Sequence, residues 1–163
     1  NMFSREQTKL IQKLARQCLE KGLSLVTAES CTGGLLSSSL TQEAGSSKWF
    51  DRGFITYSNN SKIDALGVQG ETLENFGAVS QEVANEMSMG ALKNSEANLG
   101  ISITGIAGPD GGSLTKPVGT VYFSIANQKK VILEHKSDFK GSRETIRKES
   151  VLFVLNKLLN LTL

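Results

Sequence analysis

The chain has 163 residues, of which 39% are hydrophobic and 21% are charged, as in an ordinary globular domain. Its formal net charge of +2 at pH 7 and its scattered Lys and Arg residues exclude the basic patch of a nucleic-acid-binding protein. No stretch has the length and hydrophobicity of a membrane-spanning helix or of a signal peptide. We therefore expect one cytoplasmic domain over residues 1–163 that contacts neither nucleic acid nor membrane.

The first half of the chain alternates predicted helices with predicted strands. A capping box at residues 4–7 marks the start of the first helix, and Gly22 is suited to end it. In chain order, the patterns predict a helix over 4–22, a strand over 23–28, a helix over 32–40, a turn over 45–48, a strand over 49–57, short helices over 61–66 and 71–76, and a longer helix over 80–93.

The second half is richer in strands. It predicts a strand over 99–103, a hairpin of strands 118–126 and 130–139 around Asn127 and Gln128, and a closing helix after Ser142. Alternating helices and strands followed by a hairpin indicate an α/β fold. We expect a three-layer α/β/α sandwich with a mixed, mainly parallel sheet in a single domain.

Two predicted strand ends carry groups that could react together. Ser30 follows the first strand and precedes a helix that begins with glycines, and Tyr57 and Lys62 follow the second strand. If these strands are neighbours, the three side chains converge, and a serine beside a buried lysine is a hydrolase nucleophile with its base. Burial would have to lower the Lys62 pKa from about 10.4 towards neutrality.

Each of these residues also has a simpler interpretation. A serine at a helix start is most often an N-cap, and Lys62 alone is typical of a solvated helix surface. Tyr57 at a strand end is usually a packing residue. Thr32 could be the cap instead, which would leave Ser30 free for chemistry. Unpaired amides at this helix start, around Thr32 and Gly33, could then hold the negative oxygen of a reaction intermediate.

A cluster of glycines follows the strand over 99–103. Such a loop can present backbone amides to an anion, although a surface loop is the alternative. The sequence matches neither the dinucleotide-binding nor the P-loop signature. The candidate substrate-binding residues here are Thr104, Gly105, Ala107, Gly108, Gly111 and Gly112.

Arg143 and Arg147 lie four residues apart near the start of the closing helix, where two guanidinium groups would suit a phosphate; exposed helix arginines are the alternative. Cys31 and His135 would form a rival thiol–imidazole pair, but we expect His135 on the exposed face of its strand. No His, Cys or carboxylate set has the spacing of metal ligands, so we expect no metal and no other cofactor.

Several motifs in matching order resemble the competence-damage-inducible protein family, specifically the CinA C-terminal domain. The resemblance runs from about Leu25 to Arg147, which is most of the chain. It is carried by residues 28–34 (AESCTGG), 45–47 (GSS), 53–59 (GFITYSN), 77–80 (GAVS), 104–112 (TGIAGPDGG) and 116–121 (KPVGTV).

The resemblance implies a nicotinamide-nucleotide amidase that hydrolyses nicotinamide mononucleotide to nicotinic acid mononucleotide and ammonia. It also implies Ser30 as the nucleophile, assisted by Lys62 and Tyr57, and a stand-alone form of the module. The expected partner is a small-molecule nucleotide substrate, and we expect a homo-oligomer. Two alternatives stay open: hydrolysis of another small amide, and a non-catalytic nucleotide-binding or interaction module linked to competence or DNA damage.

Overall fold

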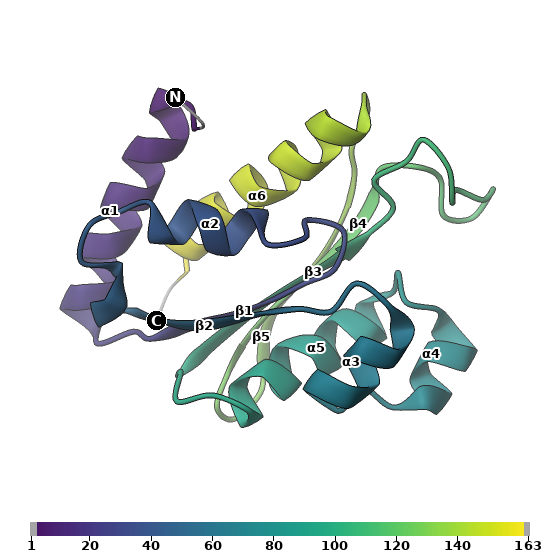
Figure 1. Ribbon diagram of the computed structural model, residues 1–163, viewed down its shortest axis with the longest axis horizontal. Helices are drawn as coiled ribbons and strands as arrows, with labels where there is room; N and C mark the ends of the chain where they lie inside the picture. The colour runs from purple at the N-terminus through teal and green to yellow at the C-terminus, as the bar shows by residue number, and fades with distance from the viewer. Residues whose placement is uncertain (1–2, 162–163) are drawn as a thin grey trace.

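The computed structural model describes residues 3–161, and Figure 1 shows its arrangement. The helices are α1 (Arg5–Lys21), α2 (Leu35–Thr41), α3 (Asn59–Leu66), α4 (Gly70–Phe76), α5 (Gln81–Lys93) and α6 (Arg143–Leu159), with a short 3-10 turn, η1, at Ser46–Lys48. The strands are β1 (Leu25–Glu29), β2 (Phe50–Ile55), β3 (Leu99–Gly105), β4 (Thr120–Asn127) and β5 (Val131–Asp138).

The five strands form one mixed sheet in the order β2-β1-β3-β4-β5. Strand β1 runs parallel to both β2 and β3, whereas β4 is antiparallel to β3 and to β5. The carboxyl ends of β1, β2 and β3 therefore meet at one edge of the sheet, where ligands bind in open α/β folds. Because β1 lies between two neighbours and under helices on both faces, all five of its residues are buried.

Helices cover both faces of the sheet: α1, α2 and α6 lie on one side, and α3, α4 and α5 on the other (Figure 1). The first face holds the larger apolar core, which includes Trp49 and Phe123, and the second holds a smaller core around Met87. The predicted three-layer sandwich with a mixed sheet is confirmed. Among the residues described, no helix is long and apolar enough to cross a membrane.

Two predictions about local structure were wrong. Helix α2 begins at Leu35 instead of residue 32, because Gly33 and Gly34 adopt positive φ angles of 55° and 103° and prolong the preceding turn. His135 is only partly exposed and lies on the face of β5 that packs against α6, not on the exposed face. Its ring lies 4.5 Å from that of Phe153, centre to centre, because α6 covers this face of β5.

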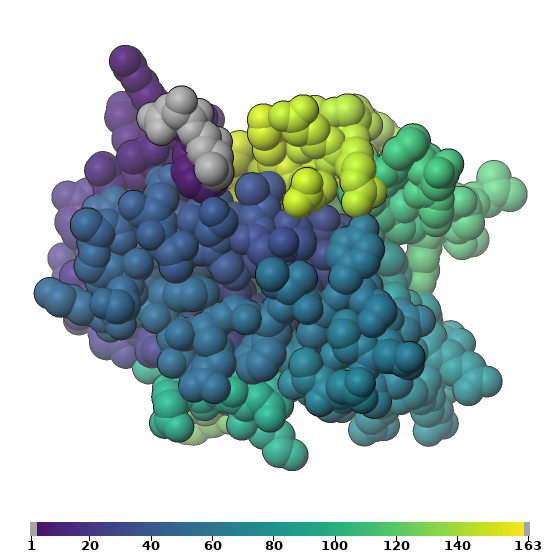
Figure 2. Space-filling view, viewed as in Figure 1, coloured from purple at the N-terminus to yellow at the C-terminus, as the bar shows by residue number. Residues whose placement is uncertain are grey.

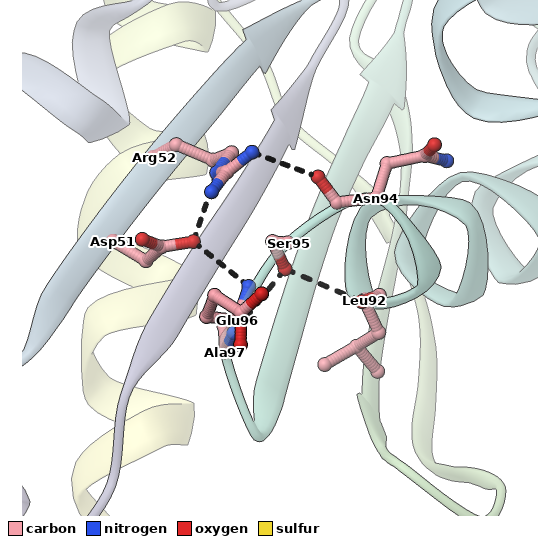
Figure 3. A network of polar contacts seen from close by, with 7 residues as sticks. All are labelled: Asp51, Arg52, Leu92, Asn94, Ser95, Glu96 and Ala97. Atoms are coloured by element: carbon pink, nitrogen blue, oxygen red, sulfur yellow. Dashed lines mark hydrogen bonds and ion pairs between the residues drawn. The ribbon is translucent and has the colours of Figure 1, made fainter.

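A polar network lies at the amino end of the edge strand β2 (Figure 3). Arg52 donates to the carbonyl of Asn94 at 3.1 Å, and Asp51 accepts from the amide of Glu96 at 3.1 Å and from Arg52 at 2.9 Å. These bonds attach the α5–β3 connection to β2. The network lies at the end of the strands remote from the site described below.

The contact between α3 and α5 yields the first testable prediction. A Cβ atom at Gly90, inside α5, would lie 1.9 Å from the carbonyl oxygen of Leu66. Inside a helix, alanine is normally more favourable than glycine by about 1 kcal/mol. At position 90, however, the added Cβ atom would force the backbones of α3 and α5 apart. We expect Gly90→Ala to lower the free energy of unfolding by about 1–3 kcal/mol, measured by urea denaturation.

Gly70→Ala is the matched control. Gly70 opens α4 on the surface, and its nearest neighbour would be an Ile63 methyl group at 4.0 Å. We expect this control to be neutral or to stabilise the protein by up to about 1 kcal/mol. Equal effects of the two substitutions would contradict the close approach of α3 and α5.

Candidate active site

Ser30 lies directly beyond the end of β1, in the middle of the sheet edge. Its amide donates to the carbonyl of Ile103 in β3 at 2.9 Å, and the amide of Thr56 donates to the carbonyl of Glu29 at 2.9 Å. Hydrogen bonds to both neighbouring strands thus continue to this point. They fix the backbone that carries the Ser30 hydroxyl. Ser30 is only 8% exposed.

Lys62 reaches the same point from α3, on the neighbouring crossover. Ser58 caps this helix by accepting from the amide of Ser61 at 3.1 Å, so that Lys62 lies in the first turn. Its side chain is fully buried, and its Nζ atom lies 2.9 Å from Ser30 Oγ. The structure therefore brings together two of the three side chains that the sequence predicted to converge.

Burial, and not its hydrogen bonds, shifts Lys62 towards the neutral amine. Its Nζ atom donates to the carbonyls of Thr56 at 2.7 Å and Tyr57 at 3.3 Å. Since these carbonyls can only accept, they take the two N–H groups of a neutral amine and leave its lone pair for Ser30. Burial lowers the pKa of Lys62 to about 8. Within residues 3–161, no carboxylate forms an ion pair with it.

Tyr57 contacts the site in two places. Its carbonyl binds Lys62, whereas its hydroxyl accepts from Arg143 Nη2 at 2.9 Å, and its side chain is 59% exposed. Arg143 also donates through Nη1 to the carbonyl of Gly108 at 2.8 Å. In Figure 2 the start of α6, the segment after β2 and the β3–β4 connection meet on one face of the molecule. A direct catalytic role for the Tyr57 hydroxyl stays a prediction.

The glycine-rich connection between β3 and β4 projects from the carboxyl end of the sheet (Figure 1). Two of its candidate residues have structural partners. The Thr104 hydroxyl donates to the carbonyl of Ala78 at 2.9 Å, and a Cβ atom at Gly105 would lie 2.7 Å from Val121.

The other members of the loop differ in exposure. Ala107 is buried, and Gly108, which precedes a cis proline, packs against Val118. Gly111 and Gly112 are exposed. Substrate binding by this loop stays a prediction.

Sequence reasoning missed the role of Glu29, which is completely buried and directly precedes Ser30. Its carboxylate accepts from the Thr32 hydroxyl at 2.7 Å, the Leu36 amide at 2.9 Å, and the Ser37 amide and hydroxyl at 3.0 and 2.7 Å. Glu29 therefore caps α2, whose own N-cap, Gly34, has no side chain. The expected caps, Ser30 and Thr32, do not fill this role. An acidic residue ending an apolar strand before two glycines was the available signal.

Arg147 holds the turn that follows Ser30. It donates through Nε to the carbonyl of Cys31 at 3.2 Å and through Nη2 to the carbonyl of Thr32 at 3.1 Å. The Cys31 thiol is buried, and burial raises its pKa to about 12, so it stays protonated and unreactive at neutral pH. His135 packs against Phe153. These surroundings do not support the alternative thiol–imidazole pair.

The chain is similar to several known proteins. The chain is 50% identical over 139 residues, 85% of each chain, to "Nicotinamide-nucleotide amidohydrolase PncC" of Enterobacter agglomerans. It is 44% identical to the protein of the same name from Escherichia coli K12, covering 96% of this chain and 95% of that one. The crystal structure of the competence/damage inducible protein CihA from Agrobacterium tumefaciens superposes with a TM-score of 0.94 at 43% identity, covering 99% of both chains.

The predicted family is also confirmed by its sequence model. The model described as the CinA C-terminal domain matches residues 7–162, nearly the whole chain. The match includes the strand ends, the turn after Ser30 and the first turns of α6. The chain therefore belongs to the CinA C-terminal domain family.

Proposed function

We propose that this protein is a nicotinamide-nucleotide amidase that hydrolyses nicotinamide mononucleotide through an ester intermediate on Ser30. The observation that carries the proposal is the 2.9 Å contact between Ser30 Oγ and the buried Nζ of Lys62. The names of the two similar amidohydrolases support the substrate. The product, nicotinic acid mononucleotide, would return to pyridine nucleotide recycling.

The reaction follows from the protonation state of the amine. Neutral Lys62 removes the proton of the Ser30 hydroxyl while Ser30 Oγ bonds to the carboxamide carbon. The resulting ammonium then protonates the amide nitrogen, which leaves as ammonia. Water attacks the nicotinoyl ester with the same amine as base, and Ser30 is released. A pKa of about 8 suits both directions of this proton transfer.

The phosphate of the substrate would bind Arg143, with the β3–β4 loop beside it. Arg143 is exposed, and no carboxylate of the described residues forms an ion pair with it. It touches the hydroxyl of Tyr57, while the carbonyl of Tyr57 touches Lys62. The distance from the Lys62 amine to the Arg143 guanidinium group is therefore spanned by Tyr57, from its backbone carbonyl to its hydroxyl. This spacing suits a ribose between the reacting ring and the phosphate.

The central test is Ser30→Ala. We expect wild-type protein to release ammonia from nicotinamide mononucleotide, and Ser30→Ala to lose at least about a thousandfold in kcat, because no attacking oxygen remains. Ser47→Ala, in the exposed turn η1 that precedes β2, should retain wild-type turnover. Undiminished turnover in Ser30→Ala would exclude the mechanism.

The buried amine predicts how activity depends on pH. Because burial lowers the pKa of Lys62 to about 8, the reactive neutral form predominates above that pH and is lost below it. We expect kcat/KM to rise about tenfold per pH unit up to about pH 8 and then level off. Lys62→Met should abolish the reaction at every pH. A wild-type profile that is flat between pH 6 and pH 9 would contradict a lysine base.

Arg143→Met tests the phosphate site. Loss of a charge-assisted contact should raise KM for nicotinamide mononucleotide about ten- to a hundredfold, and leave KM for the riboside without phosphate nearly unchanged. Arg5→Met, on the exposed surface of α1, is the control and should change neither value. Equal effects of Arg143→Met on both substrates would place the phosphate elsewhere.

A further inference from the structure

The turn after Ser30 is fixed by a backbone hydrogen bond. The amide of Gly33 donates to the carbonyl of Ser30 at 3.1 Å, which closes a turn with Cys31 and Thr32 at its centre. A Ser side chain at the first position of such a turn can hydrogen-bond the amide two residues later. This turn geometry favours a Thr32 amide on the same side of the turn as the Ser30 hydroxyl.

Arg147 sets the direction of that amide. It binds the carbonyl of Cys31 at 3.2 Å. The peptide that joins Cys31 to Thr32 is trans, so its N–H and C=O point in opposite directions. Holding the carbonyl towards Arg147 therefore turns the Thr32 amide away from α6. A second bond from Arg147, to the carbonyl of Thr32, fixes the next peptide as well.

Three amides near Ser30 are already occupied. Those of Leu36 and Ser37 bind the Glu29 carboxylate, and that of Gly33 closes the turn. Among residues 3–161 the Thr32 amide has no hydrogen-bond acceptor, and it shares its peptide with the Cys31 carbonyl that Arg147 binds. The first turn of α2 is thus unavailable to a ligand, while an oriented donor remains beside Ser30.

We propose that the Thr32 amide binds the oxyanion of the intermediate on Ser30, and that Arg147 and Glu29 are positioning residues for it. When Ser30 Oγ bonds to the carbonyl carbon, the proton passes to Lys62 and the carbonyl electron pair moves onto oxygen. The Thr32 N–H donates to that oxygen. This inference rests on the proposed serine chemistry and adds to it.

The inference gives Arg147 a different role from Arg143, although both guanidinium groups were candidate phosphate ligands. Arg147 binds two carbonyls of the turn after Ser30, whereas Arg143 binds the Gly108 carbonyl and the Tyr57 hydroxyl. A phosphate ligand acts on KM of the nucleotide alone. An oxyanion-positioning residue acts on kcat, and equally for substrates with and without phosphate.

The backbone amide cannot be removed by an ordinary substitution. The test therefore changes the two side chains that hold the turn, Arg147 and Glu29. We expect Arg147→Gln to lower kcat about ten- to a thousandfold for both nicotinamide mononucleotide and its riboside, with KM within about twofold of wild type. Arg147→Lys, which keeps the charge but not the two-point contact, should recover only part of the loss. A raised KM for the nucleotide with unchanged kcat would overturn the inference.

A fluorophosphonate probe provides a readout that does not need the amide substrate. Ser30 Oγ bonds to phosphorus, the P–F bond breaks, fluoride leaves, and the proton passes to Lys62, while the phosphoryl oxygen occupies the oxyanion position. We expect slower labelling in Arg147→Gln and in Glu29→Gln, and wild-type labelling in Arg5→Met.

The labelling outcomes separate the two proposals. Labelling of wild-type protein without hydrolysis of nicotinamide mononucleotide would reject the proposed substrate, while slower labelling in Arg147→Gln would still support the oxyanion site. Labelling of Arg147→Gln and Arg147→Lys at the wild-type rate would overturn the inference, whatever the substrate. Circular dichroism and thermal melts identify any variant that is unfolded, and Arg147→Lys then decides the test.

Discussion

The site depends on a lysine amine that is sealed from water without a counter-ion. A charged ammonium group in such a place costs several kcal/mol, and Lys62 lowers that cost by giving up its proton more readily. The carbonyls of Thr56 and Tyr57, left free where β2 ends, satisfy the amine. Strand β2 must therefore end where it does, and α3 must begin directly afterwards, for the amine to face Ser30.

Glu29 is a second buried ionisable group beside Ser30, and it is stabilised differently. Four donors surround its carboxylate, including the Leu36 and Ser37 amides at the positive end of α2. Hydrogen bonds of this kind offset the cost of burying a carboxylate. The lysine and the glutamate do not pair with each other, so each keeps a separate task. In the proposed mechanism Lys62 exchanges protons, whereas Glu29 fixes the backbone around Ser30.

Much of the fold and the meeting of Ser30 with Lys62 could be predicted from the sequence, because the carboxyl ends of neighbouring parallel strands lie together. What could not be predicted depends on side-chain direction. Arg147 binds two carbonyls because of where α6 crosses the turn after Ser30. Likewise, His135 is covered because α6 packs over β5, and strand alternation alone does not reveal which face is covered.

Arg143 and Arg147 come from α6, the last helix described, whose Val151, Val154 and Leu155 are buried in the larger core. Ribosomes make a chain from its amino end, so Ser30 and Lys62 emerge long before Arg143 and Arg147. A growing chain therefore contains Ser30 and Lys62 before it contains the two arginines that contact the segments around them. Docking of α6 therefore completes both the larger core and the contacts that Arg147 makes beside Ser30.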